Sequence, residues 1–212
     1  MIRKLVLVAL FSGLLLTGRV SAVSAAQGFY LGGDILYSMI AGDFNGVDGP
    51  EADPGAGFGL VVGYGFTPAF SFQIDWNATV HDSQVVTGDP TSDGGFGAFI
   101  LGFKLSFQVD QPFQPFLHLG WGSFAFVMDD PAIGDVELTG TGFDIGIGAD
   151  YYTNPNFSFG FGVSRRFIDY DELKIFGNTG SLSPEVKGDS TTIDLNFVYH
   201  FGAGWTGGSS EF

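Results

Sequence analysis

Hydrophobic and polar side chains alternate with a period of two along most of the chain after residue 27. In residues 70–77, for example, Phe70, Phe72, Ile74 and Trp76 share one face, and the residues between them are small or polar. Strict alternation over such lengths is typical of a β-strand and not of a helix. The pattern predicts strands over residues 28–38, 57–66, 70–80, 96–109, 113–127, 142–152, 157–167 and 191–201.

The connections between these segments also alternate. Short, proline-containing connections lie at residues 67–69, 110–112 and 153–156. Long polar connections lie at residues 39–56, 81–95, 128–141 and 168–190. An even number of strands with short turns at one end and long loops at the other is typical of an up-and-down barrel. The sequence therefore predicts an all-β fold, an eight-stranded antiparallel up-and-down transmembrane β-barrel.

The choice of a membrane rather than water outside the barrel depends on volume. The apolar face of the strands carries more large side chains, many of them Phe, than an eight-stranded barrel can enclose. The opposite face is small or polar, as at Gly59, Gly63 and Gly146. Charged residues make up only 15% of the chain, too few for a water-facing exterior. We therefore expect the apolar face to meet lipid and the small, polar face to line the lumen.

The N-terminus has the features of a secretory signal peptide. Arg3 and Lys4 precede an apolar stretch, residues 5–16, and small residues follow it. This order of charged, apolar and small residues is typical of a cleaved export signal. We expect residues 1–26 to be the signal peptide, residues 27–201 the barrel, and residues 202–212 a short glycine-rich tail.

Composition excludes several classes of function. A net charge of −15 argues against nucleic acid, which needs a basic surface. The absence of Cys excludes disulfides and thiol catalysis. The acidic segment 43–49 lacks the ligand spacing of an EF-hand, so we expect no metal site and no cofactor. Most acidic residues fall in the long loops, as at Asp43, Asp48, Asp129 and Asp130.

Three segments resemble strands of small bacterial outer-membrane barrels: GFYLGGD at residues 28–34, PFLHLGWG at 115–122 and GFDIGIGADYY at 142–152. The chain is therefore similar to the outer-membrane β-barrel domain family, which includes OmpA-like and OmpW-like proteins. The resemblance implies location in the cell outer membrane, insertion from the periplasm by the barrel-insertion machinery, and long loops outside the cell. The expected partners are outer-membrane lipid and lipopolysaccharide, and we expect a monomer.

Charged side chains on the lumen face are the strongest candidates for function. A hairpin centred on Pro155 places Asp144 opposite Arg166, and we expect Asp194 to share that arginine. A hairpin centred on Gln111 places Lys104 opposite His118. Because buried charges are normally paired, these residues form a predicted lumen charge network. Its members are Asp34, Asp75, Lys104, His118, Asp144, Arg166 and Asp194.

The network has two competing interpretations. Ion pairs stiffen a filled, closed barrel, or they line a narrow water-filled path that selects solutes by charge. We expect a non-enzymatic surface or structural barrel that forms a narrow porin-like channel for small solutes. The alternative is a binding or adhesion protein that acts through acidic extracellular loops with a closed lumen. A distant alternative is a lipid A-modifying hydrolase that uses His81 and Ser83, which follow the third predicted strand.

Overall fold

The computed structural model describes residues 27–44, 47–48, 53–83, 92–130, 134–175 and 177–201. The predicted signal peptide, residues 1–26, and the predicted tail, residues 202–212, lie outside the described residues. Among the described residues, no helix is long and apolar enough to span a membrane.

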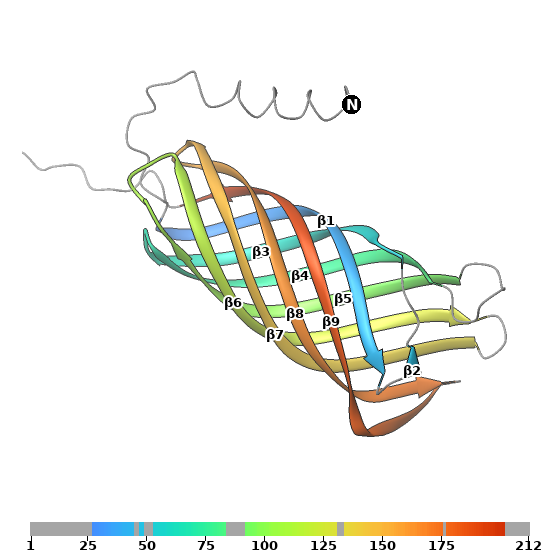
Figure 1. The fold of residues 1–212 in the computed structure, drawn as a ribbon. Coiled ribbons are helices and arrows are strands. Elements are labelled where there is room, and N and C mark those ends of the chain that lie inside the picture. Colours follow the sequence, from blue (N-terminus) through green and yellow to red (C-terminus); the bar gives the residue numbers. More distant parts are fainter. Residues whose placement is uncertain are drawn as a thin grey trace, which may run out of the picture.

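The chain folds into a closed antiparallel barrel, which confirms the predicted fold class (Figure 1). Each long strand pairs with its neighbours in chain order, and the last strand, β9, pairs back with β1. The two-residue strand β2 pairs with the end of β1 and lies outside the closed ring. The strands are β1 (Gly28–Phe44), β2 (Val47–Asp48), β3 (Gly55–Thr67), β4 (Phe70–Ser83), β5 (Ser92–Ser106), β6 (Phe113–Asp130), β7 (Gly134–Asn154), β8 (Phe157–Ile175) and β9 (Asn178–His200).

The register of the pairs fixes the tilt of the strands. Paired residues followed around the barrel from Leu31 of β1 lead back to β1 at Ala41, ten residues further along the strand. With spacings of roughly 3.3 Å along a strand and 4.8 Å between strands, this offset gives a tilt of about 40° and a diameter of about 16 Å. Such a barrel has an interior just wide enough to be filled by side chains.

The exterior carries a belt of exposed, large apolar side chains. Phe143 and Ile147 on β7 are each 64% exposed. Beyond Phe143, toward the long-loop end, the outward positions of β7 become polar, as at Glu137, and on β8 Phe167 is followed outward by Asp169. An apolar belt with aromatic residues at its edge and polar residues beyond it is the surface expected for a barrel in lipid. We call the strands beyond this edge the extension.

The extension differs from the prediction of long loops. Residues 128–141 and 168–190 are almost entirely strand. In the first segment β6 ends at Asp130 and β7 begins at Gly134, and in the second β8 ends at Ile175 and β9 begins at Asn178. The prediction was wrong there because the outward side chains turn polar, which resembles a solvated loop in the sequence. At the opposite end, β5 stops at Ser106 and not at residue 109, because Gln108 adopts a left-handed turn conformation with φ of 55°.

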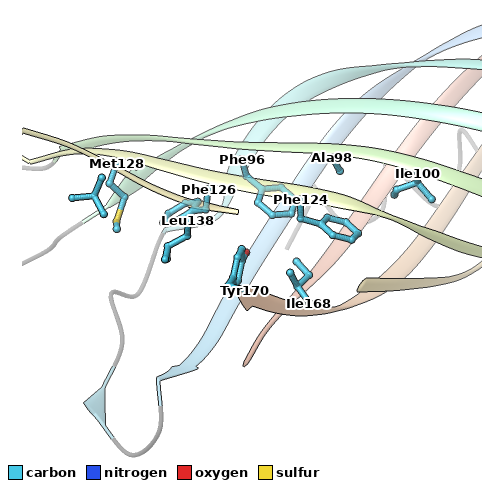
Figure 2. Close-up of a cluster of buried hydrophobic side chains, with 10 residues drawn as sticks. Phe96, Ala98, Ile100, Phe124, Phe126, Met128, Leu138, Ile168 and Tyr170 are labelled. Carbon is cyan, nitrogen blue, oxygen red and sulfur yellow. The ribbon is translucent and has the colours of Figure 1, made fainter. Parts of the chain in front are cut away.

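Inside the extension, apolar side chains from β5 to β8 pack against one another (Figure 2). Phe96 and Phe124 are each 2% exposed, and their rings stack with centroids 6.1 Å apart. The expectation of a small and polar lumen is therefore wrong at this end of the barrel. We call this group the outer cluster: Phe96, Ala98, Ile100, Phe124, Phe126, Met128, Val136, Leu138, Ile168 and Tyr170.

The outer cluster should act as an ordinary hydrophobic core. We expect Phe124→Ala to lower the free energy of unfolding by about 3–5 kcal/mol, because it removes a buried ring and leaves a cavity. The matched control is Ser123→Ala at the neighbouring outward position, with an expected change below about 0.5 kcal/mol. Urea unfolding of the refolded barrel measures both values. Equal effects of the two substitutions would contradict a packed core in the extension.

Candidate functional site

The lumen holds a cavity of about 110 Å³ on the short-turn side of the outer cluster. Its lining runs from Thr67 and Pro68 in the turn between β3 and β4 to Leu36 and to Ile100, which belongs to the outer cluster. All members of the predicted lumen charge network line this cavity, together with Asp150. The structure thus brings together Asp34, Asp75, Lys104, His118, Asp144, Arg166 and Asp194.

Asp144 is the centre of the ion-paired part of the cavity. Asp144 lies opposite Arg166 in the β7–β8 register, as predicted, and Arg166 Nε donates to Asp144 Oδ2 at 3.1 Å. His118 Nδ1 donates to Asp144 Oδ1 at 2.9 Å. Both carboxylate oxygens of Asp144 are therefore satisfied, and the side chains of Asp144 and Arg166 are only 2% and 4% exposed. This geometry satisfies a buried charge and holds β6, β7 and β8 in register.

His118 connects this pair to a second carboxylate. Its Nε2 lies 3.7 Å from Asp75 Oδ2 across the lumen. Gln73 Nε2 donates to both oxygens of Asp75 at 2.9 Å each. The imidazole therefore stands between two carboxylates, those of Asp75 on β4 and Asp144 on β7. This bridge from β4 through β6 to β7 was not part of the prediction, which paired His118 with Lys104 alone.

Lys104 has a different partner from the one its register suggests. Lys104 lies opposite His118 in the β5–β6 register, as predicted. Its Nζ, however, turns toward the short-turn end and forms an ion pair with Asp150 Oδ2 at 2.6 Å. It also lies over the Phe116 ring, 4.2 Å from the centroid. The long, flexible side chain of Lys104 reaches the carboxylate of Asp150, because the imidazole of His118 cannot neutralise the charge of the lysine.

The prediction that Asp194 shares Arg166 is wrong. In the β8–β9 register Arg166 lies opposite Ser190, whereas Asp194 lies opposite Gly162, four residues further toward the short-turn end. Asp194 instead accepts a hydrogen bond from Asn196 Nδ2 at 3.4 Å. The register could not be derived from the sequence because the turn between β8 and β9 lies within a segment predicted to be a long loop.

His81 is buried, and both of its ring nitrogens are hydrogen-bonded. Its Nδ1 donates to the Asp53 carbonyl at 3.0 Å, so its Nε2 accepts from the Thr79 hydroxyl at 2.7 Å. Burial lowers the pKa of this imidazole, the Asp53 carbonyl opposes that shift, and the side chain is 1% exposed. Ser83 pairs through its backbone with Ser92, and its side chain lies outside the described residues. With both ring nitrogens engaged, the imidazole is placed to anchor the segment before β3 to β4.

Some lining residues were missed by the sequence analysis because they are uncharged. Asn196 lies on the lumen face of β9 and is 8% exposed. The Tyr30 hydroxyl lies 3.2 Å from Ser71 Oγ and 3.3 Å from Gln73 Oε1. The period of two already places Asn196 on the lumen face. Only the structure shows which polar atoms of these residues meet.

Comparison with known proteins supports the same architecture. The family model described as "Outer membrane protein beta-barrel domain" matches residues 7–201 of the chain. A curated relative, Outer membrane protein A of Buchnera aphidicola subsp. Schizaphis graminum, is 27% identical over 150 residues. That match covers 68% of this chain and 40% of the relative's length.

Solved structures share the fold at low identity. Neisserial surface protein A has a TM-score of 0.61 at 17% identity, with 84% of this chain and 99% of that chain covered. OprG from Pseudomonas aeruginosa has a TM-score of 0.57 at 18% identity, with 83% and 97% covered. At these identities the likeness concerns the fold alone.

The buried and exposed ion pairs of this barrel should respond differently to the loss of one charge. We expect Asp144→Asn to lower the free energy of unfolding by about 3–5 kcal/mol, because it leaves Arg166 buried without its carboxylate. Glu137→Gln in the exposed Glu137–Lys174 pair, whose atoms are 3.0 Å apart, should cost at most about 1 kcal/mol. Urea unfolding at one pH compares them. A tolerated Asp144→Asn would contradict the central role of this carboxylate.

Proposed function

The chain belongs to the outer membrane protein beta-barrel domain family, and from that premise we propose that it is a non-enzymatic barrel with a closed lumen. In this proposal the extension, which stands outside the cell, is the working surface of the protein. The observation that carries the proposal is the outer cluster, which fills the lumen of the extension with buried apolar side chains (Figure 2).

Two successive barriers support a closed lumen. In the outer cluster, Phe96, Phe124, Ile100 and Ile168 are each at most 2% exposed, and an apolar constriction of this kind excludes water and ions. Below it, Arg166 is held by Asp144 and lies 5.9 Å from the centre of the Phe96 ring. An ion that crossed the barrel would have to displace packed side chains and separate a buried ion pair.

The outer wall of the extension has the composition of a surface exposed to water. Acidic side chains predominate on its β7, β8 and β9 positions. Within the described part of this surface two of them are ion-paired, Glu137 with Lys174 and Asp189 with Arg165. Asp169 and Glu172 are exposed and form no ion pair with another described residue. Such a surface favours partners with cationic groups. It supports the binding or adhesion role over the porin-like role.

A narrow channel is the second candidate, and the cavity is the observation that favours it. The cavity reaches the turn residues Thr67 and Pro68 and is lined by charged side chains. A path through the barrel would require the outer cluster to open. Hydrolysis of lipid A has no comparable support, because His81 is only 1% exposed and its ring is hydrogen-bonded to Thr79 and the Asp53 carbonyl.

Lipid, lipopolysaccharide and the barrel-insertion machinery are the partners that we propose for residence in the outer membrane. The continuous apolar belt supports contact with lipid around the barrel, as at Leu60 and Leu195, which are 52% and 53% exposed. A barrel surrounded by lipid in this way is consistent with a monomer.

Single-channel recording tests the closed lumen. We expect refolded protein from Gln27 onward to give no discrete current steps in a planar bilayer, with heat-modifiable gel migration as proof that the barrel has formed. The triple variant Phe96→Ala, Phe124→Ala and Arg166→Ala should introduce conductance, because it removes the two stacked rings of the first barrier and the ion pair of the second.

Discrete steps from the wild-type barrel that change in Lys104→Ala would instead support the channel.

To test the surface role, residues 171–186 of the β8–β9 hairpin are replaced by a short turn. The shortened barrel should remain heat-modifiable, and cells that display it should lose adhesion to surfaces that carry cationic groups. Adhesion equal to that of the complete barrel would contradict the role proposed for the extension.

A further inference from the structure

Two buried oxygen atoms in the cavity point toward the same place without a hydrogen-bond donor. Asn196 Oδ1 and Asp150 Oδ1 have no partner among the described residues. A Cβ atom built on Gly160 would lie 2.8 Å from the first and 2.7 Å from the second. Both oxygens therefore converge over Gly160, on the lumen side of β8.

Neighbouring interactions fix the orientation of these two groups. Asn196 Nδ2 donates to Asp194 Oδ2, which turns Oδ1 of the same amide toward Gly160. Asp150 Oδ2 is held by Lys104 Nζ at 2.6 Å, which leaves Oδ1 free to face Asn196. Asn196 and Asp150 are only 8% and 2% exposed. Two fixed and buried acceptors without a donor are costly, so the site is suited to a ligand that donates.

The charge of the lining indicates a cation. Asp34, Asp75, Asp144, Asp150 and Asp194 line the cavity, against the permanent cations Lys104 and Arg166. His118 lies between Asp75 and Asp144. Among the described residues, neither Asp34 nor Asp194 forms an ion pair, and an uncompensated carboxylate in a confined site attracts a mobile positive charge.

The shape of the site favours an organic ammonium ion over a metal. The described residues contain no group of three or more His, Cys, Asp or Glu placed to hold a metal ion. Aromatic rings surround the short-turn end of the cavity, where Tyr30 and Tyr152 lie 5.5 and 5.1 Å from the His200 ring centre. The Lys104 ammonium already rests on the Phe116 ring, 4.2 Å from its centre, a contact that aromatic faces offer to any ammonium.

We propose that this cavity binds a small primary alkylammonium ion, which enters from the short-turn end and donates N–H groups to Asn196 Oδ1 and Asp150 Oδ1. The outer cluster closes the other end, so the ligand comes from the periplasmic side in the orientation given above. A cavity of about 110 Å³ accommodates a short alkyl chain behind the ammonium group. This site is separate from the working surface on the extension.

Isothermal titration of the refolded barrel in zwitterionic detergent tests the proposal. The probe is propylammonium chloride, and sodium chloride keeps the ionic strength constant. At about pH 8, where exposed carboxyls are ionised, we expect saturable binding of one ion per barrel. Trimethylpropylammonium carries the same charge without N–H donors, and we expect it to bind at least about tenfold more weakly.

Variants locate the site. Asn196→Leu removes one acceptor and should lower the propylammonium affinity by at least about tenfold. Gly160→Ala should do the same, because its Cβ occupies the point where the oxygens converge. The matched control is Gly95→Ala, where an added Cβ meets nothing within 4 Å, and it should leave binding unchanged.

Heat-modifiable migration confirms folding of each variant before titration, and Asn196→Leu alone decides the test if Gly160→Ala does not fold. The proposal is overturned by equal affinity for the trimethylated probe or unchanged affinity in folded Asn196→Leu. Absence of saturable heat would also overturn it, and water and protons would then satisfy these oxygens.

Discussion

The structure depends on one constraint, the closure of the hydrogen-bond ladder between β1 and β9. In lipid every backbone N–H and C=O group needs a partner within the protein, so a sheet that crosses the membrane cannot keep a free edge. The ten-residue offset between Leu31 and Ala41 satisfies this requirement with eight strands. That offset fixes the tilt and the radius, and the radius leaves room inside for side chains and one small cavity.

Along their length the strands pass from lipid into water. At the edge of the belt the apolar side chains change from the outward face to the inward face. Within the belt, Phe143 faces lipid while Asp144 faces the lumen. In the extension, Leu138 is buried inside and Glu137 lies on the outer wall. Within the membrane the outward side chains are apolar because they contact lipid, and the polar and charged side chains, including the ion pairs, face the lumen. Beyond the membrane the apolar groups return to the interior, where they close the barrel.

This reversal explains which parts of the fold and of the site could be predicted from the sequence and which could not. The period of two and the turn positions were sufficient for the fold class, the lumen face and the opposition of Asp144 to Arg166. Residues 168–190 were misassigned as a loop because their polar side chains face outward, although Ile168 and Tyr170 continue the inward period. The partners of Lys104 and Asp194 depend on side-chain reach and on the β8–β9 turn, which the alternation of residues does not specify.

Apolar side chains face outward in the belt and inward in the extension, and cysteine accessibility in a lipid bilayer tests this reversal directly. The chain contains no native Cys, so each introduced cysteine reports on one position. Single cysteines are introduced at Ala98, which faces inward in the outer cluster, at Ser123, which faces outward in the extension, and at Ile147, which faces lipid. A water-soluble maleimide should label only Ser123→Cys rapidly. Rapid labelling of Ala98→Cys in the folded barrel would show that water fills the extension and would contradict a closed lumen.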